Sequence, residues 1–403
     1  MELFWLEHKK LWRKKIVKIC VLLCFVYCVI FGSILSFQWF SFGSSDDYTS
    51  AFGNNFDGYT VIKDSQEYAL SFGGELTDET LQQIVSDYQQ MEADGMEEEL
   101  EKTDWQIVNS WLGTLYPELR DTSNYKTMIS YVDPDKLTGF YERRQQVLDE
   151  FLEVSGQVGA EKEFLHQIER KVEKPFHYEW VEGWSTLLGS MVADLGVVMA
   201  LFLGIVLSSL FAGEWRDNTS TLVLTTRNGW GKIALAKILT GLAFTVELFA
   251  LLAVSSVISQ LFFMGTAGWD MPIQNIKLIA VAPMNMLQAE IYEYAFVLLG
   301  AIGFAGIVMF ISAAVKNNVL TLLLSLAVVY GPMMIAEYLP YEMQKALDLI
   351  PLVGSSTDIF RTNTFRIFGK LIWSPYLLIT IPVLIGILCM PFAIKSWSRR
   401  MKA

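Results

Sequence analysis

Residues 183–213 read GWSTLLGSMVADLGVVMALFLGIVLSSLFAG, a stretch of 31 residues with one charged side chain, Asp194. A bilayer core of about 30 Å needs about 20 residues of α-helix, so this stretch is long enough to span it. Other largely uncharged stretches lie at 19–45, 238–269, 294–315, 317–336 and 371–394. Soluble helices of such length normally carry a charged face. The sequence therefore predicts an α-helical polytopic membrane protein with six transmembrane helices.

The charged residues divide the chain into two parts of opposite sign. Residues 43–182 carry 30 Asp and Glu against 11 Lys and Arg, whereas the rest carries 13 acidic and 20 basic residues. An acidic domain is thus inserted after the first predicted span. Such a domain would repel phosphate groups, so nucleic acid is not an expected partner.

The four cysteines all lie in predicted spans, so the inserted domain cannot depend on disulfides. Cys20, Cys24 and Cys28 are four residues apart and share one face of a helix. Packing of small apolar side chains is the preferred interpretation of this face, with lipidation or a redox role as the alternative.

The basic residues predict the orientation. Fifteen lie in the N-terminal tail, the loop after the second span, the connection at Lys316 and the C-terminal tail, against five in the short loops of the opposite side. Basic loops stay in the cytoplasm. Both termini are therefore predicted to be cytoplasmic, and residues 43–182 extracellular.

The predicted segments follow in chain order. They are an interfacial amphipathic helix (1–15), membrane helix 1 (19–42), the acidic extracellular domain (43–182), membrane helix 2 (184–212), a cytoplasmic elbow (213–232), membrane helix 3 (233–264), an outer loop (265–293), membrane helix 4 (294–315), membrane helix 5 (318–337), an outer loop (338–373), membrane helix 6 (374–394) and a cytoplasmic tail (395–403).

The inserted domain is predicted to be mainly helical, with a core of its own. Thr77 is an expected helix cap, because acidic residues follow it in the first turn. Asp133-Pro134 is expected to open another helix, and residues 58–72 fit a strand or a short helix equally. Apolar residues repeat at helical spacing after Thr77, at Leu81, Ile84, Val85 and Tyr88.

Motifs for nucleotide binding or catalysis are absent from the sequence. It contains no G-x-x-x-x-G-K-[ST], no G-x-S-x-G and no H-E-x-x-H. The three histidines do not cluster with cysteines at metal spacing. The acidic run Glu97–Glu99 lacks the calcium-loop pattern and is expected to be a solvated face. The chain is therefore not expected to be an enzyme, and no catalytic residue, metal or cofactor is assigned to it.

Two carboxylates fall inside predicted spans. Asp194 lies in the second and Glu247 near the middle of the third. A charge in a bilayer is costly, so such groups face a bundle interior, pair with a partner or become protonated. Both are candidates for a polar substrate or proton path; the alternative is a structural hydrogen bond between helices.

Two cytoplasmic segments are candidates for contacts outside the chain. Residues 1–15 are expected to lie in the lipid interface, apolar side down, through Phe4, Trp5, Leu11 and Trp12; a plain basic tail is the alternative. The elbow at 213–232 suits docking of a soluble partner, although it could be an ordinary basic loop. Its candidate docking residues are Glu214, Arg216, Asp217, Thr219, Leu222, Leu224, Arg227 and Lys232.

A family resemblance becomes specific at this elbow. The pattern E…T…L…T…G…K…AK resembles the coupling helix of type-2 ABC exporter permeases. It is carried by Glu214, Thr219, Leu222, Leu224, Thr226, Gly229, Lys232, Ala236 and Lys237. Three further stretches resemble permeases of this kind from Gram-positive bacteria: SQEYALSFGGELTDETLQQIVSDYQ (65–89), PFHYEWVEGWSTL (175–187) and GWDMPIQ (268–274). The large domain after the first span is similar to the layout of sodium-efflux-type permeases and of lipid-exporting ABC proteins.

The resemblance implies a permease subunit in a bacterial cytoplasmic membrane. It implies a separate ABC ATPase that binds ATP and Mg, and a second permease copy or a related permease. The exported substrate would be a peptide, a drug or a lipid-like molecule. The acidic domain would favour cationic substrates within a Debye length of about 8–10 Å.

Two other function classes fit the sequence. A non-transporting sensor or mechanotransmission subunit would detect an extracellular peptide or cell-wall component and pass the signal through its helices. An intramembrane enzyme is the third reading, without a catalytic constellation behind it.

Overall fold

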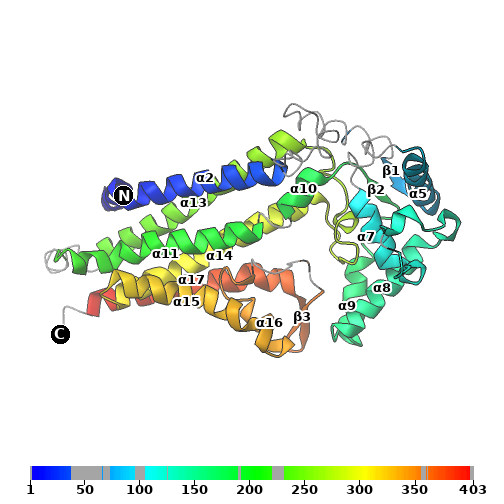
Figure 1. Ribbon diagram of the computed structural model, residues 1–403. Coiled ribbons are helices and arrows are strands. Elements are labelled where there is room, and N and C mark those ends of the chain that lie inside the picture. Colours follow the sequence, from blue (N-terminus) through cyan, green and yellow to red (C-terminus); the bar gives the residue numbers. More distant parts are fainter. Residues whose placement is uncertain are drawn as a thin grey trace.

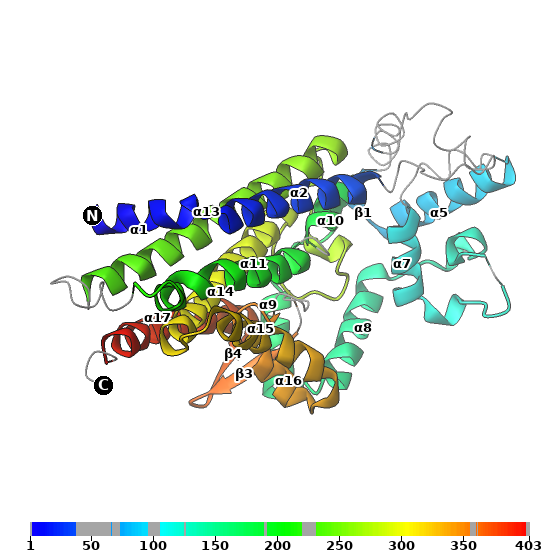
Figure 2. The same ribbon diagram turned by 60° about the vertical axis from the view of Figure 1, so that its left-hand side comes forward.

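The computed structural model describes residues 2–37, 66, 73–95, 105–124, 126–188, 192–219, 231–354, 360 and 362–399. These residues form a bundle of long helices with a smaller domain at one end (Figure 1). The bundle helices are α1 (Glu2–Arg13), α2 (Lys15–Phe37), α11 (Val192–Arg216), α13 (Lys232–Met264), α14 (Met286–Ala314), α15 (Asn318–Ile335) and α17 (Ser374–Arg399). The N-terminal helix and the end of α17 lie at the end of the bundle away from this domain (Figures 1 and 2).

Five helices in the described part of the chain are long and apolar enough to cross a membrane: α11, α13, α14, α15 with its short extension, and α17. The chain is thus a helical multi-pass membrane protein. The helix α2 covers most of the first predicted span, which stays a prediction. Two helices begin eight residues from their predicted starts: α11 at Val192 instead of residue 184, and α14 at Met286 instead of residue 294. The start of α14 is fixed by a capping box between Asn285 and Gln288.

The central helices of the bundle are α11 and α14. Their apolar segments are 72% and 61% buried, whereas that of α15 is 17% buried and therefore peripheral. The helix α14 also packs against α17. Their backbones are so close that a Cβ on Gly303 would come within 2.3 Å of the Pro382 carbonyl oxygen. Small residues that let helices approach in this way are typical of membrane bundles.

The inserted domain is mainly helical in its described part, as predicted. Its elements are β1 (Gly74–Leu76), α5 (Asp78–Ala93), α7 (Trp105–Leu115), the 3-10 turns Pro117–Leu119, Met128–Ser130 and Pro134–Lys136, α8 (Phe140–Val154), α9 (Ala160–Glu169) and β2 (Phe176–Tyr178). The strands β1 and β2 pair antiparallel and close the domain, with Glu75 opposite His177. The helix α10 (Glu182–Thr186) leads back into the bundle.

One predicted cap is confirmed and one helix start needs correction. The Thr77 hydroxyl accepts a hydrogen bond from Thr80 N and caps α5, whose Leu81, Ile84 and Val85 are buried. Asp133-Pro134 opens a single 3-10 turn, and the α-helix starts only at Phe140. The reason is Gly139, whose φ of +72° breaks the helical path. Residues 58–65 and 67–72, for which a strand or a helix was open, lie outside the described residues.

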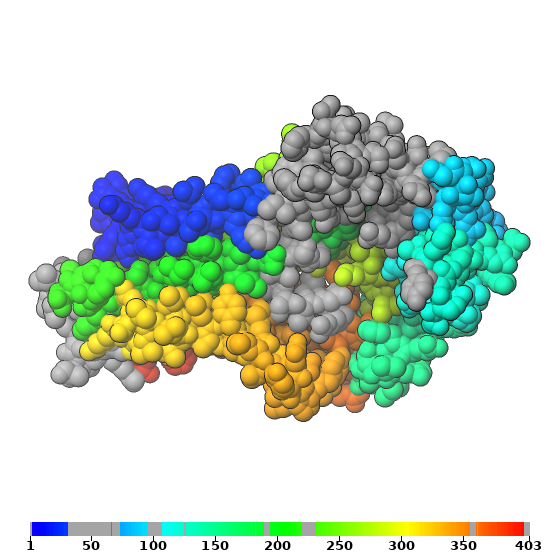
Figure 3. All heavy atoms as spheres, in the orientation of Figure 1, coloured from blue at the N-terminus to red at the C-terminus, as the bar shows by residue number. Residues whose placement is uncertain are grey.

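Smaller elements line the end of the bundle near the inserted domain. They are the 3-10 turns Ile273–Asn275 and Ala336–Tyr338, α16 (Tyr341–Leu347) and the hairpin of β3 (Thr364–Ile367) with β4 (Lys370–Trp373). The hairpin touches the inserted domain, where Arg366 pairs with Glu161 at 2.5 Å and Thr364 donates to Gln157 at 2.8 Å. The space-filling view shows this segment, in orange, next to the teal helices α8 and α9 (Figure 3).

Candidate functional site

A cluster of charged side chains with a buried centre joins three helices at the end of the bundle where the N-terminal helix lies. We name it the ion cluster; it consists of Glu7, Lys10, Glu214 and Lys237. Lys237 Nζ lies 2.9 Å from Glu214 Oε1 and 2.7 Å from Glu7 Oε2. Lys10 Nζ lies 2.5 Å from Glu214 Oε1. Two positive and two negative charges thus neutralise one another across α1, α11 and α13.

The centre of the ion cluster is held away from solvent, whereas the Lys10 side chain at its edge is 53% exposed. Lys237 is 1% exposed and Glu214 is 5% exposed. The second oxygen of Glu214 accepts a hydrogen bond from the Thr219 hydroxyl, just past the end of α11. Removing one partner of a buried pair leaves an uncompensated charge, which typically costs 3–5 kcal/mol. The cluster therefore fixes the end of α11 relative to the start of α13, on either side of the elbow.

A neighbouring lysine is affected by the same surroundings. Lys14, between α1 and α2, donates to Ser209 Oγ at 3.0 Å. Burial, followed by the charges of Lys237 and Lys10, lowers the pKa of Lys14 to about 8. A lysine that titrates this close to neutrality makes the contact between α1 and α11 sensitive to alkaline pH.

The predicted docking residues divide into buried and exposed members. Glu214 lies inside the ion cluster, whereas Arg216, Asp217 and Lys232 are exposed. Arg216 and Asp217 pair with one another at 2.9 Å on the surface. A further three candidates lie outside the described residues: Leu222, Leu224 and Arg227.

The N-terminal helix is present as α1, and it is tied to the bundle; its place in the lipid interface stays a prediction. Leu11 is buried and Trp5 is 62% exposed, so one side of α1 packs inward and the other is exposed. The Trp12 indole packs edge-on against Phe244 of α13. Phe4 packs against Trp5 and His8 on the same helix. The sequence did not indicate that Glu7 and Lys10 of this helix join the ion cluster. Their spacing of three residues, which places them on one helical face, was the available signal.

The two intramembrane candidates have separate partners. Glu247 accepts a hydrogen bond from Trp12 Nε1 at 3.0 Å and lies 3.2 Å from His8 Nε2. Asp194 has the Tyr27 hydroxyl of α2 as its hydrogen-bond partner. The structure therefore does not bring Asp194 and Glu247 together, and each makes a hydrogen bond between helices. Cys20, Cys24 and Cys28 form a buried face of α2, which packs against α13.

Two side chains of the inserted domain donate hydrogen bonds to the loop between α13 and α14. Trp111 donates its indole N–H to the Asn275 carbonyl at 2.8 Å. Arg144, fully buried, donates to the carbonyls of Leu278 at 2.8 Å and Ala280 at 3.2 Å. Any tilt of the inserted domain would therefore be passed to the loop and to the helices that it joins.

The Arg144 guanidinium is held by a buried acid. Its Nη1 lies 2.6 Å from Glu169 Oε1, and Lys174 reaches the same oxygen at 2.9 Å. Burial alone would raise the pKa of Glu169, but hydrogen bonds from Lys174 and Arg144 hold that pKa below its usual value. The carboxyl thus stays ionised and keeps Arg144 in place.

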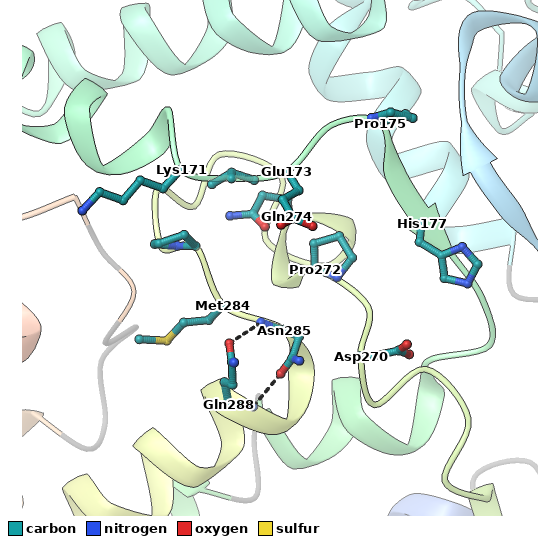
Figure 4. A pocket seen from close by; sticks show the side chains of 12 residues that line it. Lys171, Glu173, Pro175, His177, Asp270, Pro272, Gln274, Met284, Asn285 and Gln288 are labelled. Atoms are coloured by element: carbon teal, nitrogen blue, oxygen red, sulfur yellow. Dashed lines mark hydrogen bonds between the residues drawn. The ribbon is translucent and has the colours of Figure 1, made fainter.

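A polar cavity of about 400 Å³ opens at this junction. Its walls are residues 171–177 of the inserted domain and residues 270–288 of the loop and of α14 (Figure 4). Lys171, Glu173, His177 and Asp270 supply charged or titratable side chains. The cavity suits a small polar ligand or one side chain of a larger one. The described residues contain no group of His, Cys, Asp and Glu that could hold a metal ion.

Sequence reasoning missed two buried acids on α14. Glu290 is 4% exposed and Glu293 is 6% exposed, although both belonged to a predicted outer loop. The signal that could have found them is the capping pair Asn285 and Gln288, which starts the helix before both acids.

Comparisons of the chain with protein-family models, with curated protein sequences and with solved structures find no match.

Proposed function

We propose that this chain is the membrane-spanning permease subunit of an ATP-driven ABC exporter, in a bacterial cytoplasmic membrane with both termini cytoplasmic. The observation that carries the proposal is the ion cluster. Glu214 and Lys237 bracket the elbow that resembles a coupling helix, and they form one buried ion pair at 2.9 Å. A displacement of the elbow by a bound partner would therefore move α11, α13 and α1 together.

The elbow contains both exposed and buried residues, which supports one role in docking a partner and another in transmitting movement to the helices. The exposed Arg216, Asp217 and Lys232 are available to a soluble partner, and the buried Glu214 is not. In the proposed mechanism, two ATPase subunits dimerise on ATP and displace the exposed part of the elbow. The ion cluster transmits the displacement to the helices, and the path opens outward.

The inserted domain provides a place for substrate capture at the far end of the bundle. Its cavity is lined partly by the loop that leads into α14, so an occupant would contact domain and helices at once. Charges of both signs line this cavity, and a peptide, a drug or a lipid-like headgroup with polar atoms would suit it.

The experiment is purification of the tagged chain from its native host in mild detergent, followed by mass spectrometry and an ATP hydrolysis assay. We expect a stoichiometric ATPase to co-purify. Arg216→Ala with Lys232→Ala should weaken that association. Glu214→Gln should leave the ATPase bound but remove the stimulation of hydrolysis by substrate, because the elbow is then no longer fixed to α13.

A matched control for these variants is Glu92→Gln. It removes one half of an ion pair with Lys126 (2.7 Å) on the surface of the inserted domain. Association and hydrolysis should be unchanged in this variant. A preparation that contains no ATPase would refute the exporter proposal.

The second candidate is a sensor subunit without transport. It is favoured by the buried contacts of Trp111 and Arg144 with the loop between α13 and α14, which would serve a signal as well as a transport cycle. The two functions differ in one readout. A sensor would change its partner's activity on binding a ligand, and reconstituted vesicles would accumulate no substrate in the presence of ATP.

A further inference from the structure

The hairpin of β3 and β4 is held at its base and extends freely at its turn. At the base, the Thr364 hydroxyl donates to Gln157 Oε1 of the inserted domain at 2.8 Å. The Ser374 amide donates to the Asn363 carbonyl at 3.0 Å and closes the hairpin where α17 begins. At the other end, the turn at residues 368–369 projects away from the bundle helices and from the inserted domain (Figure 2). The contacts of the base therefore determine where the turn lies.

Phe368 at this turn combines two uncommon features. Its side chain is fully exposed, at 102%. Its φ is +49°, and the φ of the following Gly369 is +79°. Positive φ at both turn residues is typical of the type I′ hairpin turn, in which Asn-Gly or Asp-Gly is preferred. A bulky side chain in the left-handed region is an outlier, so both the backbone and the surrounding water disfavour phenylalanine here. This combination indicates that the ring has a partner outside the described chain.

The chain connectivity places the turn beside the membrane. The strand β4 ends at Trp373, and α17, a helix long and apolar enough to cross a membrane, begins at the next residue. Each arm of the hairpin has four residues and is about 13 Å long, because a strand rises about 3.3 Å per residue. The turn therefore lies within about 15 Å of one end of a candidate span. A hairpin that leaves the bundle to one side at this level meets the lipid interface.

The side chains near the turn have the composition of a membrane interface. Lys370, next to the turn, is exposed and has no ion-pair partner among the described residues. At the same end of the bundle, Tyr376 is 61% exposed and Tyr338 is 85% exposed. Aromatic rings are enriched where a membrane meets water, and a lysine there keeps its ammonium group among the headgroups. These neighbours favour lipid as the partner of the Phe368 ring.

We propose that the β3–β4 hairpin is a membrane anchor, whose Phe368 ring enters the lipid interface on the side of the inserted domain. The partner of this surface is the bilayer, and the contact is made by an apolar ring beside a cation. The anchor also restrains the inserted domain, because Arg366 of the hairpin pairs with Glu161 of α9 at 2.5 Å. The proposal needs only the membrane spans and the hairpin, and it does not depend on the exporter function.

Fluorescence quenching by lipid tests the contact directly. Phe368→Trp keeps an aromatic ring at the turn, and the full chain is placed in nanodiscs of phosphatidylcholine brominated on its acyl chains. Both faces of a nanodisc are open to solvent, so aqueous iodide reaches every exposed ring. The signal of the new side chain is the emission of the variant minus that of the wild type. We expect brominated lipid to remove most of this signal and iodide to leave most of it.

The matched control is Thr122→Trp. Thr122 lies on an exposed turn of the inserted domain, away from the bundle. The signal of this variant should be lost with iodide and kept with brominated lipid. If iodide alone removes the signal of Phe368→Trp, the turn lies in water and the proposal is wrong. If neither quencher reaches that signal, a protein surface such as a second copy of the chain covers the turn, and the proposal is equally wrong.

A second variant, Phe368→Asn, tests the anchor through the sign of its effect. Asparagine adopts the left-handed region more readily than phenylalanine, so the turn alone should become more stable. Withdrawal of the ring from lipid acts in the opposite direction. In nanodiscs, we expect the amides of residues 365–372 to exchange about tenfold faster than in the wild type, the effect of losing partial burial of one phenylalanine ring. Exchange that is unchanged or slower would show that the hairpin gains nothing from lipid, which contradicts the anchor.

Discussion

The contact between the inserted domain and the bundle can be tested at Arg144. We consider Arg144→Met, which keeps much of the side-chain volume and removes the guanidinium. The wild-type group donates three hydrogen bonds: one to Glu169 at 2.6 Å and two to the carbonyls of Leu278 and Ala280. All three are lost in the variant, and the side chain is fully buried, so water cannot replace them.

The free-energy cost of Arg144→Met depends on which partners Glu169 keeps in the variant. Breaking a buried pair by removing one partner typically costs 3–5 kcal/mol. Here Lys174 still reaches Glu169 at 2.9 Å, so the carboxylate is not left alone. We therefore expect the lower end of that range, about 3 kcal/mol, which corresponds to roughly a hundredfold change in a local opening equilibrium.

Hydrogen exchange of the full chain in lipid nanodiscs measures this opening. The amides of residues 275–282 should exchange roughly a hundredfold faster in Arg144→Met. The matched control is the adjacent Arg143→Met. Arg143 pairs with Glu118 at a half-exposed position, and a pair of that kind is worth about 1 kcal/mol or less.

Replacing both partners of the buried pair sharpens the test. The double variant Arg144→Met with Glu169→Met should recover part of the lost protection, because no buried charge is then left uncompensated. Exchange of residues 275–282 that stays within threefold of the wild type in Arg144→Met would refute the assigned role of Arg144.

Three further predictions concern other parts of the chain. Gly303→Ala places a methyl group against the backbone of α17 and should lower the unfolding free energy by about 1–3 kcal/mol in detergent titrations. The control is Gly331→Ala, whose new methyl group meets nothing within 4 Å and should not lower the unfolding free energy. Burial and the charge of Lys237 lower the pKa of Lys14 to about 8 from its usual 10.5. Between these two pH values the unfolded chain binds more protons than the folded chain, so the free energy of unfolding should rise with pH across that range. Lys14→Met should abolish this rise in thermal unfolding scans, and an unchanged rise would contradict the assignment of the pKa to Lys14. Thr77→Ala removes the cap of α5 and should cost about 1 kcal/mol, seen as faster amide exchange in the first turn of that helix alone.

The sequence was sufficient for the features that depend on one segment at a time. Length and apolar content identify a membrane helix because the bilayer thickness sets the number of residues required. This is why the stretches that became α11, α13, α14, α15 and α17 could be recognised. The cap at Thr77 was likewise predictable, since its hydrogen bond to Thr80 is local.

The tertiary structure decided everything that depends on which segments meet. Glu214 was predicted as a surface docking residue, and its burial arises from Lys10 and Lys237, one far away in the sequence and one across the elbow. Asp194 and Glu247 looked equivalent as isolated acids in apolar runs, yet they face different helices. Glu290 could not be recognised as a buried acid until the cap at Asn285 placed it inside α14, where it is 4% exposed. The physical reason is that burial and pairing of a charge depend on neighbours in space, and a single sequence gives only the neighbours along the chain.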